Sequence, residues 1–417
     1  MLILLSLIVY SLPFWSLPFI PGTYSAITPY ITALLGVFYF FYCIVIDGRV
    51  NKASILLSFF FLTLILIYSV FSLSYYDNAI VNSVFYIVGF FSFLGFSFLF
   101  RFYTFEQVLN RLYHVSLFVS FYAIFDLLSS KIDSLSGIRN LLSMFLVGTE
   151  SPRLLITTSE PSWAVQLLLF CSVPLIFKYQ RTKSKLCLLL VFTNILAFLS
   201  AFSMTGFIVL LVSMLLHLLL FSKVKISSVM KSMVVFFFLV LGIYTTYNIF
   251  SGDGGYIFSR ISRLIDILMN GSSSIYYAII SIDNSLLIRL GYPTVAFNMV
   301  LDHPLGLGVG AFSNNLQYYT HLLDVPSFST SEVPNHLANN NADPRNYFLR
   351  IAVDFGVFGI LFMLYYAKAS ISRLKRNGDL LTKSYFCITF AMMLQFSTFY
   401  FSIYMFVFAM IWSSKYD

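Results

Sequence analysis

The chain has 417 residues, of which 59% are hydrophobic and only 10% are charged. A water-soluble domain carries about a quarter of its residues as charges, so this composition excludes a soluble globular enzyme. It is also too hydrophobic for a disordered chain. The formal net charge of +8 would suggest an acidic partner for a soluble protein. In a chain so rich in apolar runs, the positive charge is instead explained by membrane topology. We therefore predict no nucleic-acid partner.

Apolar runs of about 20 residues, the length that a helix needs to cross a bilayer, recur along the chain. Strands of a membrane barrel would alternate apolar and polar residues, whereas these runs are continuous. We therefore predict an all-α polytopic membrane protein, a single integral membrane domain over 1–417 with 11 or 12 transmembrane helices. The last run is one tilted helix or two short ones. The predicted spans are 2–20, 29–46, 53–74, 79–100, 107–128, 161–178, 186–201, 204–222, 231–250, 347–367 and 384–413.

The distribution of Lys and Arg predicts the orientation, because cytoplasmic connections carry an excess of both. Sixteen of these residues fall in one alternating set of connections and eight in the other. The richer set is predicted to be cytoplasmic, together with the N-terminus. The opposite, periplasmic face holds two long loops, 129–160 and 251–346, which we expect to carry the functional site. Within the second loop, Ile261–Leu268 and Tyr292–Leu301 are typical of short amphipathic helices on the membrane surface.

Arginine dominates the positive charge of the periplasmic face, with seven Arg and one Lys. A guanidinium group binds phosphate in a bidentate fork, and helix N-termini add further N–H donors. Arg153, Arg289 and Arg345 each lie at or near a predicted helix start. They predict a site for a pyrophosphate or an anionic sugar. The alternative is that each arginine is a solvated loop charge or pairs with a nearby aspartate.

Glu160 directly precedes Pro161 at the start of a long predicted span. It is either an N-terminal helix cap or a general base toward a sugar hydroxyl. His336 is the second candidate base, with a solvated loop histidine as the alternative.

Asp354 falls inside a predicted span, which makes it a functional candidate unless it simply pairs with Arg350 one turn away. The rings of Trp163 and Tyr347 either stack on sugars or belong to the aromatic belt of the membrane interface. The four cysteines all lie in apolar runs, and we expect no disulfide.

Three short motifs, in this order and on one face, resemble the Wzy-type O-antigen or capsule polymerases of the O-antigen ligase/polymerase superfamily. The resemblance in span count and in one large late external loop covers nearly the whole chain. The motifs are Arg153 through Glu160-Pro-Ser-Trp163, Arg289 with the later Asp302-His-Pro-Leu-Gly-Leu-Gly-Val-Gly310, and Arg345-Asn346-Tyr347 leading to Asp354-Phe-Gly-Val-Phe-Gly359.

The resemblance implies a metal-independent, inverting glycosyltransferase without a cofactor. It would transfer a growing glycan from undecaprenyl pyrophosphate onto a new lipid-linked repeat unit, at the periplasmic face of the inner membrane. The implied partners are the undecaprenyl-pyrophosphate-linked oligosaccharide and membrane lipid, with a chain-length regulator and a flippase as candidates. The implied catalytic residues are Glu160, Arg153, Arg289 and Arg345, and the implied substrate-binding residues are Asn346, Tyr347, His303, His336 and Trp163.

Two other activities compete with polymerisation. A ligase would move the finished chain to lipid A core, but ligase relatives usually carry His-Asn where this chain has Arg345-Asn346. A flippase of lipid-linked sugars should have charges within its spans and matching halves. Here the charges cluster on one face and the halves do not match. A structural subunit without chemistry would not need this set of arginines.

Overall fold

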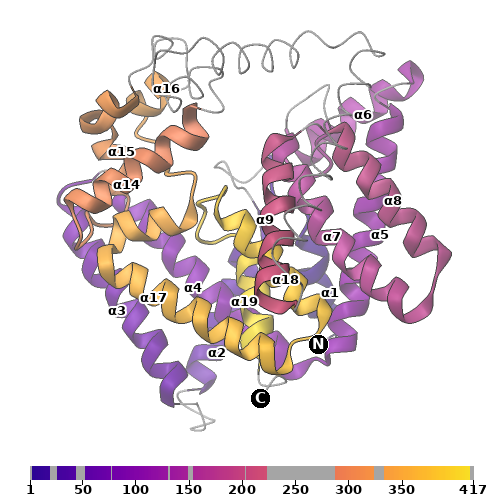
Figure 1. Ribbon diagram of the computed structural model, residues 1–417, viewed down its shortest axis with the longest axis horizontal. Helices are drawn as coiled ribbons and strands as arrows, with labels where there is room; N and C mark the ends of the chain where they lie inside the picture. Colours follow the sequence, from indigo (N-terminus) through magenta and orange to yellow (C-terminus); the bar gives the residue numbers. More distant parts are fainter. Residues whose placement is uncertain are drawn as a thin grey trace.

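The computed structural model describes residues 2–18, 26–43, 52–76, 78–129, 132–148, 154–201, 203–222, 287–323 and 333–413. This described part of the chain contains fifteen α-helices, one π-helical turn, one 3-10 helix and no strand (Figure 1). The predicted all-α fold is therefore confirmed.

Seven of the nine described helices in the N-terminal half follow the predicted apolar runs, whereas the first is shorter than its run and the sixth lies in the predicted loop 129–160. The nine described helices are α1 (Leu2–Ser11), α2 (Thr28–Tyr42), α3 (Lys52–Leu73), α4 (Ala79–Phe102), α5 (Phe105–Ser129), α6 (Asp133–Leu146), α7 (Pro161–Thr182), α8 (Lys185–Ser200) and α9 (Met204–Phe221).

The second half begins, where it is described, with short elements and ends with longer helices. They are η2 (Leu287–Gly291), α14 (Tyr292–Asp302), α15 (Ala311–Asn315), η3 (Leu316–Leu323), α16 (Val333–Ala338), α17 (Tyr347–Asn377), α18 (Leu380–Met393) and α19 (Ser402–Trp412). The helix predicted on Tyr292–Leu301 is present as α14, and the one predicted on Ile261–Leu268 lies outside the described residues.

Four helices, α4, α5, α7 and α17, are long and apolar enough to cross a membrane, and six shorter apolar helices accompany them. The predicted first span, 2–20, is too long, because α1 ends at Ser11. Pro13 lacks an N–H group and restricts the residue before it, which stops the helix there. The predicted span 231–250 lies outside the described residues.

The last predicted run, 384–413, is two helices rather than one. α18 ends at Met393 and α19 begins at Ser402. The connection between them, 394–401, contains Gln395 and Ser397, whose polar groups suit a turn better than a helix buried in lipid. Ser397 Oγ donates a hydrogen bond of 2.6 Å to Asp343 Oδ1, so this connection lies beside the start of α17.

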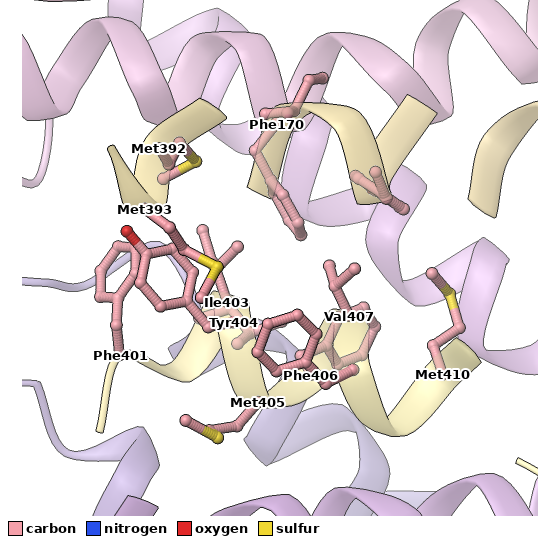
Figure 2. Close-up of a cluster of buried hydrophobic side chains, with 14 of the residues drawn as sticks. Phe170, Met392, Met393, Phe401, Ile403, Tyr404, Met405, Phe406, Val407 and Met410 are labelled. Carbon is pink, nitrogen blue, oxygen red and sulfur yellow. The ribbon is translucent and has the colours of Figure 1, made fainter. Parts of the chain in front are cut away.

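α19 runs through the centre of the bundle, with every residue from Ser402 to Ile411 buried. Figure 2 shows Phe170 of α7 pointing toward Phe406 of α19, and their ring centroids are 6.4 Å apart. The neighbouring α2 and α4 approach more closely than side chains would permit. A Cβ atom on Gly36 would lie 1.8 Å from the carbonyl oxygen of Phe91, so glycine allows the backbones to meet, as is common between membrane helices.

The described parts of the two long connections lie at the same end of the molecule. In Figure 1, α6 and α14–α16 occupy the upper side, whereas the N- and C-termini lie at the lower side. The elements from η2 to α16 share a small hydrophobic core of their own, which includes Tyr292, Val295, Phe312 and Leu316. We call residues 287–323 and 333–338 the cap.

Candidate functional site

Arg289 and Glu160 face each other at the capped end of the bundle. Arg289 lies in the π-helical turn η2 and Glu160 immediately before α7. The distance from Arg289 Nη2 to Glu160 Oε2 is 4.0 Å, and the two side chains are 29% and 41% exposed. A charge-assisted hydrogen bond measures about 2.7–2.9 Å, so this is an attraction between opposite charges and not a closed bidentate pair.

The carboxylate of Glu160 makes no side-chain cap hydrogen bond at the start of α7. Its backbone carbonyl accepts the N–H groups of Trp163 and Ala164. Its Oε2 atom instead accepts a hydrogen bond of 2.9 Å from Ser162 Oγ. The helix therefore starts through the extended backbone of Glu160 and Pro161 at the first helical position, which leaves the carboxylate directed at Ser162 and Arg289.

Arg345 occupies the second part of the site, directly before α17. Its φ of +51° is left-handed, a conformation that costs a non-glycine residue about 1 kcal/mol or more. Asp343 stabilises this turn: its Oδ1 atom accepts the Arg345 N–H at 2.8 Å and lies 3.7 Å from Arg345 Nε. The next residue, Asn346, caps α17 by accepting the Leu349 N–H at 3.1 Å.

The connection 394–401 joins these two parts of the site. Ser397 bonds to Asp343, as described above, and Leu394 O accepts a 3.3 Å hydrogen bond from Asn346 Nδ2. The ring of Phe396 meets the ring of Trp163 edge to face, with centroids 4.9 Å apart. Because Trp163 is in the first turn of α7, one short connection contacts the start of α7 and the start of α17.

The cations around Asp343 favour the ionised form of its carboxyl group. Burial acts to raise the pKa of Asp343, but Arg345, the Ser397 hydroxyl and Arg350 together favour the carboxylate. The net effect holds the pKa of Asp343 below its ordinary value. Asp343 is therefore ionised at neutral pH and orients the Arg345 guanidinium.

Two of the substrate-binding residues expected from the sequence, Trp163 and Tyr347, are buried. Trp163 and Tyr347 are only 3% and 2% exposed, and Tyr347 stacks on Phe399 with ring centroids 5.6 Å apart. Both rings pack inside the bundle, where a sugar has no access to them, so we leave them out of the proposed site.

The two expected loop histidines lie in the cap. His336 Nδ1 is 2.7 Å from the Tyr292 hydroxyl, within the cap core. His303 follows the end of α14 and is exposed. Arg153, the remaining expected site residue, lies outside the described residues.

The glycine-rich run after α14 docks on a break in α17. Gly356 has φ 58° and ψ −142° inside that helix, and the N–H of Val357 turns to the carbonyl of Pro304 at 2.8 Å. In return, Leu307 and Gly308 donate to the carbonyls of Val353 and Asp354 at 2.8 and 3.1 Å. The run therefore fastens the cap to α17, which carries Arg345 at its start.

Asp354 lies at this break and is engaged by two side chains. It accepts a hydrogen bond of 2.7 Å from the Tyr86 hydroxyl, and its Oδ2 atom is 4.0 Å from Arg350 Nε. Arg350 also donates to Asn82 and, at 3.4 Å, to the carbonyl of Ser397. The predicted pairing of Asp354 with Arg350 is thus present, and it links the break to the connection 394–401.

Asp343, Ser397 and Asp126 were not predicted from the sequence as members of the site. The spacing of Asp343 and Arg345 is a signal that a sequence reading could use. The contacts of Ser397 and Asp126 join segments that are far apart in the chain, so these contacts cannot be predicted from local sequence. Asp126 binds Arg139 with an Oδ1–Nε distance of 2.5 Å, so Arg139 is paired inside the protein.

Within the described ranges, no group of three His, Cys, Asp or Glu side chains could hold a metal ion. All four cysteines are buried, and none forms a disulfide.

Part of this chain matches a known protein family. Residues 186–364 match the family model Wzy_C, described as O-antigen ligase. The matched segment includes α8, α9, the cap and the first half of α17, and so contains both Arg289 and Arg345. Glu160 precedes it. No curated protein matches the chain.

Proposed function

We propose that this multi-pass membrane protein, which carries a Wzy_C O-antigen ligase family domain over residues 186–364, is an O-antigen or capsule polymerase. The family assigns glycan transfer of the O-antigen ligase/polymerase type in lipopolysaccharide biosynthesis. Within this class of reaction, we propose that a growing glycan passes from undecaprenyl pyrophosphate onto a new lipid-linked repeat unit. The observation that carries it is the approach of Arg289 to Glu160 at the capped end of the bundle.

The arginines would bind the pyrophosphate of the donor. Arg289 and Arg345 come from separate elements, and Arg153 directly precedes the described segment that leads to Glu160. During transfer, the bond from the anomeric carbon to the phosphate oxygen breaks and negative charge builds on the leaving pyrophosphate. Guanidinium groups already fixed in place stabilise that charge without reorganising, and this role needs no metal ion.

Glu160 would act as the general base. The acceptor sugar hydroxyl attacks the anomeric carbon from the face opposite the pyrophosphate, its proton passes to the carboxylate, and the configuration inverts. Two features support this role: the carboxylate makes no cap hydrogen bond, and 41% of the side chain is exposed. His336 is the weaker candidate, because its ring is engaged with Tyr292 in the cap core.

The capped end would face the periplasm. The support is the Lys and Arg bias of the connections together with the arrangement in Figure 1, where α6 and α14–α16 lie opposite the termini. A lipid-linked donor presented at the outer leaflet would then meet the arginines at that end.

The glycan profile of a deletion strain separates the polymerase from the ligase. A polymerase predicts lipopolysaccharide with one repeat unit on the core. Bare core with accumulated long lipid-linked chains would instead identify a ligase, and unchanged profiles of both lipopolysaccharide and capsule would reject both activities. A flippase predicts lipid-linked repeats retained at the cytoplasmic leaflet, which external glycosidase treatment of oriented vesicles detects.

A further inference from the structure

The segment 154–160, which we call the strap, leads directly to Glu160. Residues Leu154 to Thr158 are all buried, with Thr157 and Thr158 completely so. The strap is neither helix nor strand, and Ile156 has a left-handed φ of +56°. A buried irregular segment needs partners for its backbone polar groups, and here those partners come from two other parts of the chain.

Asp126, near the end of α5, binds one side of the strap. Its Oδ2 atom accepts the N–H groups of Leu155 at 3.0 Å and Ile156 at 3.2 Å. Its Oδ1 atom receives Arg139 Nε of α6 at 2.5 Å. The Asp126 and Arg139 side chains are only 4% and 10% exposed, so the pair is held away from water.

The connection after α1 binds the opposite side of the strap. The Thr157 hydroxyl donates to the carbonyl of Pro13 at 2.5 Å. Ser159 N–H donates to Ser16 Oγ at 3.0 Å, and Ser16 Oγ donates to Ser159 Oγ at 3.0 Å. The strap is thus fixed between two elements immediately before Glu160.

We propose that Asp126 and Arg139 are positioning residues for glycan transfer, because their buried ion pair holds the strap and thereby places Glu160 opposite Arg289. This inference rests on the proposed function of Glu160. The carboxylate stabilises a left-handed turn that a β-branched residue such as Ile156 adopts at a cost. Arg139 holds that carboxylate in place and is its buried partner, because a buried charge without a partner is strongly unfavourable. Neither residue needs to touch the substrate.

The first experiment measures how well the backbone amides of the strap are protected from exchange with solvent. Full-length protein is reconstituted in lipid nanodiscs, and hydrogen–deuterium exchange is followed for wild type and Asp126→Asn. Loss of a hydrogen bond to a charged acceptor predicts exchange about tenfold faster or more in peptides that cover 154–160, with α17 and α19 unchanged. Unchanged exchange of the strap in Asp126→Asn overturns the proposal.

The second experiment measures catalysis with a lipid-linked repeat unit as substrate. A displacement of about 1 Å at a reacting group lowers the rate about 100-fold, so Asp126→Asn and Arg139→Gln should lower kcat on that order with little change in KM. Arg139→Lys should recover part of the loss. Glu106→Gln is the matched control, because Glu106 lies at the other end of α5 in an exposed ion pair with Arg181, and its kcat should stay at the wild-type value.

A double variant separates positioning from general destabilisation. If Asp126 acts through Glu160, then Asp126→Asn should cause no further loss of rate in a Glu160→Gln background. An additional loss of the same size as in wild type overturns the proposal. If Asp126→Asn does not fold, Thr157→Val tests the same point from the other side, because it removes only the bond to Pro13 and should also lower kcat.

Failure of this inference is distinguishable from failure of the proposed function. If the strap loosens and kcat stays at the wild-type value while Glu160→Gln is inactive, the positioning role alone is wrong. If Glu160→Gln is fully active, the base assignment is wrong, and with it the inference that depends on it.

Discussion

Arg289 Nη2 lies 4.0 Å from Glu160 Oε2, although Arg289 belongs to the cap and Glu160 to the start of α7. The two groups are close enough to attract each other but too far apart for a short charge-assisted hydrogen bond. In the proposed mechanism, a donor phosphate would compete with Glu160 for the Arg289 guanidinium. This relationship connects the Wzy_C segment with a residue that precedes it.

Replacing either described site arginine tests the anion site directly. Arg289→Ala and Arg345→Ala should abolish long-chain glycan while protein level and the single-repeat product stay normal, because pyrophosphate charge is no longer stabilised. Gel profiles of lipopolysaccharide give the readout. We expect Arg153→Ala to behave in the same way.

Lysine variants at the same positions decide how the arginines act. Arg289→Lys and Arg345→Lys should also fail if the contact is bidentate, because an ammonium group cannot reproduce the planar fork. Rescue by lysine would point to a simple charge requirement. Normal ladders from all the alanine variants would refute the site assignment.

Glu160→Gln tests the general base. The amide keeps the shape and accepts the Ser162 hydrogen bond but cannot take a proton, so kcat should fall by about 10²- to 10⁴-fold. Rates measured across pH on purified protein provide the check, and full activity of the variant rejects the base role.

Gly356→Ala tests the joint between the cap and α17. A Cβ atom there would lie 2.2 Å from the carbonyl carbon of Leu305, in a backbone conformation that L-residues rarely adopt. Overpacking of this kind costs about 1–3 kcal/mol, so we expect a lower melting temperature and a displaced cap. Gly137→Ala in α6 is the matched control, because its added Cβ meets nothing within 4 Å. Equal melting temperatures for the two variants would contradict this account of the joint.

Asp343 predicts a loss of stability at acid pH. Its folded pKa is depressed, against the opposing effect of burial, by Arg345, Ser397 and Arg350. The stabilisation is therefore complete above the unfolded value of about 3.9 and is lost as the pH falls through the lower folded value. Melting curves in detergent between neutral pH and pH 3 should show this contribution in wild type and lack it in Asp343→Asn. Parallel curves for the two proteins would show that Asp343 contributes nothing.

The amino-acid sequence was sufficient to identify an all-helical membrane protein, because the length and continuity of each apolar run are local properties of the chain. It also identified Glu160, Arg289 and Arg345 as candidates, from residue type and position near helix starts. The same reasoning overextended the first helix past Ser11 and left the run 384–413 undecided, because hydrophobicity by itself does not locate a turn.

Only the tertiary structure decided which charges meet. Arg139 and Arg289 look alike in the sequence, yet Arg139 is buried against Asp126 and Arg289 is partly exposed opposite Glu160. The break of α17 at Gly356 likewise depends on a loop that arrives from the cap. Partners of this kind are distant in the chain. The energy of a contact between charges depends on their distance and burial, and tertiary packing sets both, so local sequence does not predict them.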